Sequence, residues 1–199
     1  MSQNDPVAAS QAPRAAPVGL DRLTSVEAQA AANPANAAAI QLESFPVDYV
    51  EGADVGYRWY EKQRQRPLFA FGHGLSFTSF AYRNPVVTGG RRLSVTFDVV
   101  NTGRREGADV PQIYVAQAAA DGAGTATPMR LAGFTRLTLK PGESRRVTLT
   151  AEPRVVAQYD TALPGWRIAG GRYRVALAHD AADRSQLLTT TLEPMTMKP

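Results

Sequence analysis

After residue 80 the sequence alternates apolar and polar residues in short runs, and this alternation most limits what the chain can fold into. In residues 91–101, Leu93, Val95, Phe97 and Val99 fall on one face, and the residues between them, mostly polar, fall on the other. Side chains of a β-strand point alternately to its two faces. The pattern therefore predicts a strand with one buried face.

Further runs with strand character follow along the second half of the chain. They cover residues 109–117, 130–139, 144–151, 166–168, 173–177 and 185–192. Segments rich in Gly and Pro separate them, and no helical period lies between. Pro111 predicts the start of a strand or an edge strand, because proline cannot donate a ladder hydrogen bond. Six or seven such strands within residues 80–193 predict an all-β, immunoglobulin-like antiparallel sandwich.

The first 44 residues have a different composition, rich in Ala, Pro, Gln and Asn. A short helix over residues 25–32 is predicted there, with Thr24 as its cap, Glu27 in the third helical position and Pro34 ending it. Few large apolar residues are available to hold this helix against a core. Residues 1–44 are therefore predicted to be mostly mobile, and residues 194–199 to form a tail.

Residues 45–79 form a third kind of segment, dense in aromatic residues and broken by glycines. Linkers that pack against nothing are seldom so aromatic, because flexible linkers are rich in Gly, Ser and charged residues. We expect an irregular connector that packs against the sandwich and against a neighbouring part of the protein.

Composition excludes several function classes. The chain has no cysteine, so disulfides, thiolate nucleophiles and cysteine-bound metals are excluded, and two histidines make a histidine-rich metal site implausible. The net charge of +4 comes from scattered arginines, whereas a nucleic-acid-binding protein concentrates charge on one face. No run approaches the ~20 apolar residues of a membrane span. The N-terminus lacks the apolar stretch of a signal peptide, which predicts a cytoplasmic location by default. We expect no metal, cofactor, nucleic acid or membrane partner.

No residue pattern in the chain predicts catalysis. Glu51 and Asp54 are the one suggestive carboxylate pair, but Arg58 beside them favours an ion pair on a surface loop. His73 lies between Gly72 and Gly74, which predicts a tight turn rather than an acid–base role. His179 is interpreted as a surface pair with Asp180.

Six motifs occur here in the order in which they occur in glycoside hydrolase family 3, the family of bacterial β-glucosidases. They are EGADVGYRWY, PLFAFGHGLSFTSFAY, VVNTGRREGADVPQIYV, RLAGFTRLTLKPGES, EPRVVAQYD and WRIAGGRYRVAL. Residues 45–193 thus resemble the C-terminal part of these enzymes. The resemblance implies a fibronectin type III-like sandwich at 80–193, preceded by the tail of an α/β domain at 45–79. Ala70 and Phe77 depart from the family pattern, which usually has Pro and Tyr there.

In the family that this chain resembles, the catalytic residues lie in a barrel and an α/β domain that have no counterpart here. The resemblance therefore implies a non-catalytic module that acts in domain packing and stabilisation and is inactive alone. The parent activity would be hydrolysis of terminal β-glycosidic bonds. Relatives in the family are commonly periplasmic or secreted. The residues expected to connect the domains are Arg58, Phe69, Phe71, Gly72, His73 and Gly74.

The aromatic residues Tyr57, Trp59 and Tyr60 support two interpretations. Their rings fit an interface with the glycosidase domains or with a second copy of the chain. Alternatively, they stack on sugar rings, which would make the chain a carbohydrate-binding module. The resemblance places this segment between domains and so favours the interface.

Overall fold

The computed structural model describes residues 52–118, 127–162 and 164–199, and the predicted helix at 25–32 lies outside them. The described elements are α3 (Tyr57–Lys62), β1 (Phe80–Thr88), β2 (Ser94–Asn101), β3 (Gly107–Asp109), β4 (Gln112–Gln117), β5 (Arg130–Phe134), β6 (Leu137–Leu139), β7 (Ser144–Thr150), α4 (Pro153–Val156), β8 (Gln158–Asp160), β9 (Gly165–Ile168), β10 (Gly171–Ala178), β11 (Gln186–Leu192) and β12 (Met195–Met197).

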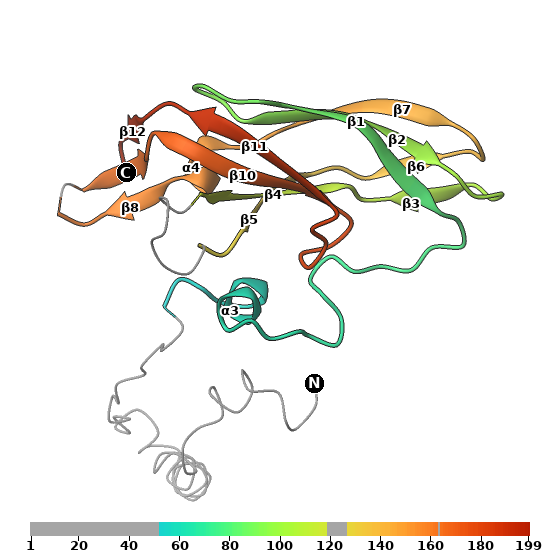
Figure 1. Cartoon of the computed structure of the whole chain (residues 1–199), viewed down its shortest axis with the longest axis horizontal. Coiled ribbons are helices and arrows are strands. Elements are labelled where there is room, and N and C mark those ends of the chain that lie inside the picture. The colour runs from blue at the N-terminus through green and yellow to red at the C-terminus, as the bar shows by residue number, and fades with distance from the viewer. Residues whose placement is uncertain (1–51, 119–126, 163) are drawn as a thin grey trace, which may run out of the picture. The chain divides into compact units, whose positions relative to one another are not determined.

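Two larger sheets form the sandwich (Figure 1). One has the strand order β1-β2-β7 and the other has the order β11-β10-β4-β5. A smaller sheet, β12-β9-β8, and the two-stranded β3-β6 ribbon complete the described strands. Every pair of named strands is antiparallel. The predicted all-β antiparallel sandwich is confirmed.

The core lies between the two larger sheets. In β2, Val95, Phe97 and Val99 are fully buried, and the residues between them are half-buried. Leu149 of β7 faces them, as do Ile113 and Val115 of β4 and Val175 and Leu177 of β10. Trp166 packs against the same cluster. The predicted inward face of residues 93–99 is thus confirmed.

Strands β4 and β10 are buried on both faces, unlike β2. In β4 every residue from Gln112 to Ala116 is buried, and in β10 Ala176 and Ala178 are buried on the face opposite the core. Pro111 does precede a strand, as predicted, but that strand is central, since β4 pairs with both β10 and β5. The expectation of an edge strand was wrong.

Several elements differ from the sequence expectations. The stretch 194–199, expected to form a tail, contains β12, which pairs with β9. Residues 130–139 form two strands in different sheets, β5 and β6, instead of one. Strand β1 was not predicted, because its alternation is interrupted at Asn84 and Pro85, where Asn84 has φ of 51° and the pairing with β2 shifts register. The connector contains the helix α3, and the six residues of α3 are too few to show a helical period.

Candidate functional site

The candidate site is the junction at which the connector packs on the outer face of the β11-β10-β4-β5 sheet. That outer face carries a second apolar cluster, which we call the docking face: Tyr114, Ala116, Met129, Ala176, Ala178 and Ala181. Tyr57 of α3 packs against it. Four of the six residues are alanines, whose small side chains let a helix approach a sheet closely.

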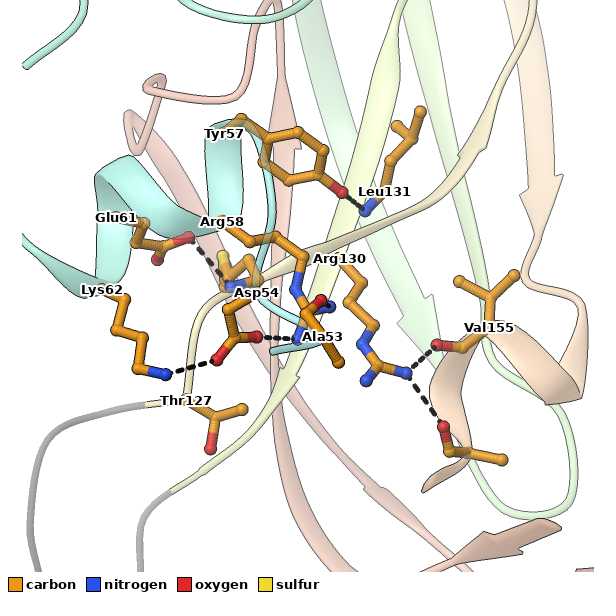
Figure 2. A network of polar contacts seen from close by, with 12 residues as sticks. Ala53, Asp54, Tyr57, Arg58, Glu61, Lys62, Thr127, Arg130, Leu131 and Val155 are labelled. Atoms are coloured by element: carbon orange, nitrogen blue, oxygen red, sulfur yellow. Dashed lines mark hydrogen bonds and ion pairs between the residues drawn. The ribbon is translucent and has the colours of Figure 1, made fainter. Parts of the chain in front are cut away.

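Tyr57 fixes α3 to the sheet through both parts of its side chain. Its ring stacks on Phe71 at a centroid distance of 5.0 Å and meets the ring of Tyr114 edge-on at 5.8 Å. Its hydroxyl oxygen accepts a hydrogen bond of 2.9 Å from the backbone N–H of Leu131 (Figure 2). Burial raises the pKa of the Tyr114 hydroxyl, so this phenol stays protonated.

Glu61 makes the second attachment, one helical turn after Tyr57. Its Oε2 accepts a hydrogen bond of 2.9 Å from the backbone N–H of Met129 (Figure 2). Its Oε1 pairs with Arg184 at 3.2 Å. The contact with Met129 satisfies a backbone donor at the start of β5. Residues Tyr57 and Glu61 share a helix face because side chains four apart are neighbours.

A third attachment lies at Gly72. The backbone N–H of Ala181 donates to the carbonyl of Phe71 at 2.8 Å, and Nε2 of Gln112 donates to the carbonyls of Gly72 at 3.4 Å and His179 at 2.8 Å. Gly72 has φ of 84°, and a Cβ there would overlap the amide group of Gln112. Both the backbone angle and the close approach require glycine.

His73 forms a turn and a side-chain contact with Asp180. Its backbone N–H donates to the carbonyl of Ala70 at 3.0 Å, and its Nδ1 lies 3.3 Å from Oδ2 of Asp180. The turn agrees with the prediction. The predicted pair of His179 with Asp180 was wrong, because the ring of His179 stacks on Tyr82 at 4.1 Å instead.

The other predicted residues lie around these attachments. Asp54 pairs with Arg58 and, at 3.1 Å, with Lys62, as expected for a surface ion pair; Glu51 lies outside the described residues. Trp59 and Tyr60 are both half-buried, and Tyr60 lines a small groove with Tyr57 and Phe71. Gly74 is exposed and has open space around it.

Part of the connector stays exposed. Four of its large apolar side chains, which we call the apolar stripe, are mostly exposed: Leu68 (90%), Phe69 (70%), Leu75 (95%) and Phe77 (91%). The ring of Phe69 lies 5.6 Å from that of His73, and Phe71 is half exposed while it stacks on Tyr57. Large apolar residues left exposed within one short segment are typical of an interaction site.

Neither a metal cluster nor a membrane-spanning helix is found among the described residues. No three His, Cys, Asp or Glu side chains in that part of the chain gather closely enough to hold a metal ion. No helix there is long and apolar enough to cross a bilayer.

Sequence reasoning identified Arg58, Phe71, Gly72 and His73 but missed their partners on the sandwich. Gln112, Tyr114 and Glu61 were not selected, and neither were the alanines of the docking face. An available indication was the unbroken apolar character of residues 113–116 and 175–178. Such runs indicate a strand that is buried on both faces.

The comparisons with known proteins agree with this architecture. A family model described as a fibronectin type III-like domain matches residues 109–181. The thermostable β-glucosidase B of Acetivibrio thermocellus is 34% identical over 143 residues, which cover 69% of this chain and 18% of that protein. The probable β-glucosidase K of Emericella nidulans is 40% identical over 148 residues, which cover 74% and 17%.

Solved structures give the same result. The GH3 β-glucosidase of Bifidobacterium adolescentis superposes with a TM-score of 0.69 and 33% identity, over 76% of this chain and 23% of that one. DesR, a β-glucosidase from Streptomyces venezuelae, superposes with a TM-score of 0.65 and 36% identity, over 72% and 18%. This chain thus spans about a fifth of the length of such relatives. It belongs to glycoside hydrolase family 3, in which it corresponds to the non-catalytic, C-terminal fibronectin type III-like module and the connector in front of it.

Proposed function

We propose that this chain packs against the catalytic part of a β-glucosidase-like enzyme and stabilises it, using the connector as the joining element. The observation that carries the proposal is that the connector has both attached and exposed residues. Tyr57, Glu61 and Gly72 fix it to the sandwich, whereas the residues of the apolar stripe remain exposed.

The exposed apolar area of the stripe favours a partner that covers it. Fully burying a side chain such as Leu or Phe is worth about 1.5–3 kcal/mol relative to leaving it exposed. Leu68, Phe69, Leu75 and Phe77 gain little of this within the chain, since each is at least 70% exposed. The attachments fix the segment that carries the stripe to the sandwich, so a partner domain that covers the stripe is fixed to the sandwich as well.

The parent activity is proposed from the relatives, which are named as β-glucosidases. We propose that the enzyme hydrolyses terminal β-glycosidic bonds and that its catalytic carboxylates lie in other domains. The chain alone is then inactive. Turnover of p-nitrophenyl β-glucoside by the purified chain, at a rate above that of a mock purification, would contradict this.

The packing proposal is tested on the full chain by light scattering after size exclusion and by binding of the dye ANS. Without its partner the stripe should make the chain self-associate and bind ANS. The variant Leu68→Ser/Phe69→Ser/Leu75→Ser/Phe77→Ser should be a monomer with weak dye binding. The control Val86→Ser/Leu187→Ser removes two apolar residues of β1 and β11 that are about half exposed, and should change neither measurement. A wild-type monomer that binds no ANS argues against the proposal.

A carbohydrate-binding module built on Tyr57, Trp59 and Tyr60 has less support. The ring of Tyr57 is engaged by Phe71 and Tyr114, and its hydroxyl by Leu131. A ring held in this way is not available as a flat surface for a sugar.

A further inference from the structure

A groove lies between the first residues of the connector, α4 and the β8–β9 hairpin. It consists of two adjoining cavities of about 620 and 610 Å³, which share the lining residues Ala53, Arg58, Arg130, Val155 and Gln158. Both volumes fall within the range of about 300–1,000 Å³ that is typical of small-molecule sites. None of these five shared residues belongs to the docking face or to the apolar stripe.

Arg130 is a half-buried cation in this groove without a carboxylate partner among the described residues. Its Nη1 donates to the carbonyls of Val155 at 3.4 Å and Ala157 at 2.9 Å (Figure 2). Within the described chain its Nε and Nη2 make no hydrogen bond. Burial first, and the neighbouring Arg58 guanidinium next, lower the pKa of Arg130. Removing a charge from water is costly unless it is paired, and the nearby Asp54 offsets only part of the lowering, so this place in the groove favours an anion.

Arg58 adds a second unsatisfied donor. Its terminal nitrogens pair with Asp54 and donate to the carbonyl of Ala53 at 2.7 Å, whereas its Nε is buried and has no partner in the part of the chain that the structure describes. Asp54 is also shared with Lys62. Asp54, the one carboxylate among the described residues that line the groove, is therefore already engaged by two cations.

The third guanidinium of the groove, that of Arg167, differs from the other two because it has its own carboxylate partner. It lies 2.8 Å from Oδ2 of Asp160 and is compensated. The positive charge without an ion pair among the described residues is thus that of Arg130, which lies where the two cavities join, beside Arg58 and its shared partner Asp54.

An aromatic wall borders the same place. Tyr159 and Trp166 line the second cavity with Arg58 and Arg130, and their rings meet edge-on at 5.4 Å. Tyr159 is 46% exposed. The C–H face of a pyranose is apolar and packs well on such a ring, while the amide of Gln158 is a hydrogen-bonding group for a sugar hydroxyl. A guanidinium fork beside it matches a planar carboxylate.

We propose that this groove binds a hexuronate unit, with the carboxylate on Arg130 and the sugar ring on Tyr159 and Trp166. The site is separate from the apolar stripe, so it stands or falls independently of the packing function proposed above.

The test uses the full chain with three probes: methyl β-D-glucuronide, methyl β-D-glucoside and acetate. Ligand-detected saturation-transfer NMR and titration calorimetry should give a dissociation constant of about 1–10 mM for the glucuronide and at least about tenfold weaker binding of the other two. The affinity for the glucuronide should fall as salt is raised. Glucoside binding equal to that of the glucuronide would overturn the role of the arginines. Acetate binding equal to it would overturn the role of the ring.

Variants assign the binding to the groove. Arg130→Gln removes the charge and should weaken glucuronide binding at least tenfold, while Arg172→Gln, an exposed arginine of β10 that lines neither cavity, should leave it unchanged. Because Arg130 also bonds to two carbonyls, its variant is checked for folding by circular dichroism. Should it not fold, Tyr159→Ser tests the same site through an exposed aromatic residue that lines it. This variant should bind the glucuronide at least fivefold more weakly. Undiminished binding by the folded Arg130→Gln or by Tyr159→Ser overturns the proposal.

Discussion

The two larger sheets of the sandwich share one core but differ on their outer faces. In the β1-β2-β7 sheet the outer face is polar, with Thr96 opposite Thr148 at 2.9 Å and Asp98 paired with Arg146. In the β11-β10-β4-β5 sheet it is the apolar docking face, covered by the connector. The difference shows that the sheet with the apolar outer face is the one that carries the connector. Four predictions test this comparison.

The largest effect should come from the shared core. Phe97 is fully buried, so Phe97→Ala should lower the free energy of unfolding by about 3–5 kcal/mol. Thr96→Ala changes the next residue on the polar outer face and should cost about 1 kcal/mol or less. Urea unfolding of both variants measures this. Similar losses for the two would mean that β2 is not half-buried.

Filling the docking face should affect stability more than filling the polar face. Ala176→Leu adds three carbons beneath the connector, where the residue is fully buried, and should cost about 1–3 kcal/mol through overpacking. It should also speed proteolytic cleavage within residues 57–75. Thr148→Leu places the same side chain on the exposed face of β7, with a net gain of one heavy atom, and should stay within about 0.5 kcal/mol. Unchanged cleavage and stability in Ala176→Leu would show that the connector does not need the docking face.

Substitutions at two glycines distinguish the cost of backbone strain from the cost of a steric clash. Gly72 and Gly142 have similar φ values of 84° and 74°, but a Cβ at Gly72 meets Gln112, whereas a Cβ at Gly142 meets nothing within 4 Å. Gly142→Ala should therefore cost about 1 kcal/mol from strain alone. Gly72→Ala should exceed that loss by about 1 kcal/mol in thermal unfolding. Equal losses would argue that Gly72 does not approach Gln112.

The smallest effect concerns charge on the polar face. A hydrogen bond from Asn84 and the contact with Arg146 lower the pKa of Asp98 below its usual range. Since the pKa is lower in the folded state, the stabilisation is present above the unfolded pKa of about 3.9 and is lost as pH falls through the folded pKa. The melting temperature of Asp98→Asn should lie slightly below wild type at pH 7, and the two should converge in acid. A difference in melting temperature that grows as the pH falls would contradict a lowered pKa of Asp98 in the folded state.

The contrast between the two outer faces also shows what sequence could and could not predict. The strict alternation of residues 93–99 predicted β2, because one face of this strand meets solvent or a polar neighbour. The same rule was applied to Tyr173, Val175 and Leu177 and found their inward face. It gave no account of Ala176 and Ala178, which are apolar because a second layer covers them.

The candidate site depended on contacts between distant residues, and these were only partly predictable. The Gly-His-Gly segment was recognised as a turn from local rules. The residues that hold it, Gln112 and Asp180, are 40 and 107 positions away from Gly72 and His73 respectively. Local pattern carries no information about such pairs, and the six-residue helix α3 was too short to show a period.

One consequence of the α3 attachments concerns aggregation. Strand β5 ends its sheet, and the outward N–H groups of an edge strand are a template for pairing with another chain. Tyr57 and Glu61 accept hydrogen bonds from the N–H groups of Leu131 and of Met129, just before β5. The connector therefore covers backbone donors at the edge of this sheet and blocks their pairing with another strand. A sandwich trimmed to begin at β1 would lose it and become open to strand addition from its neighbours.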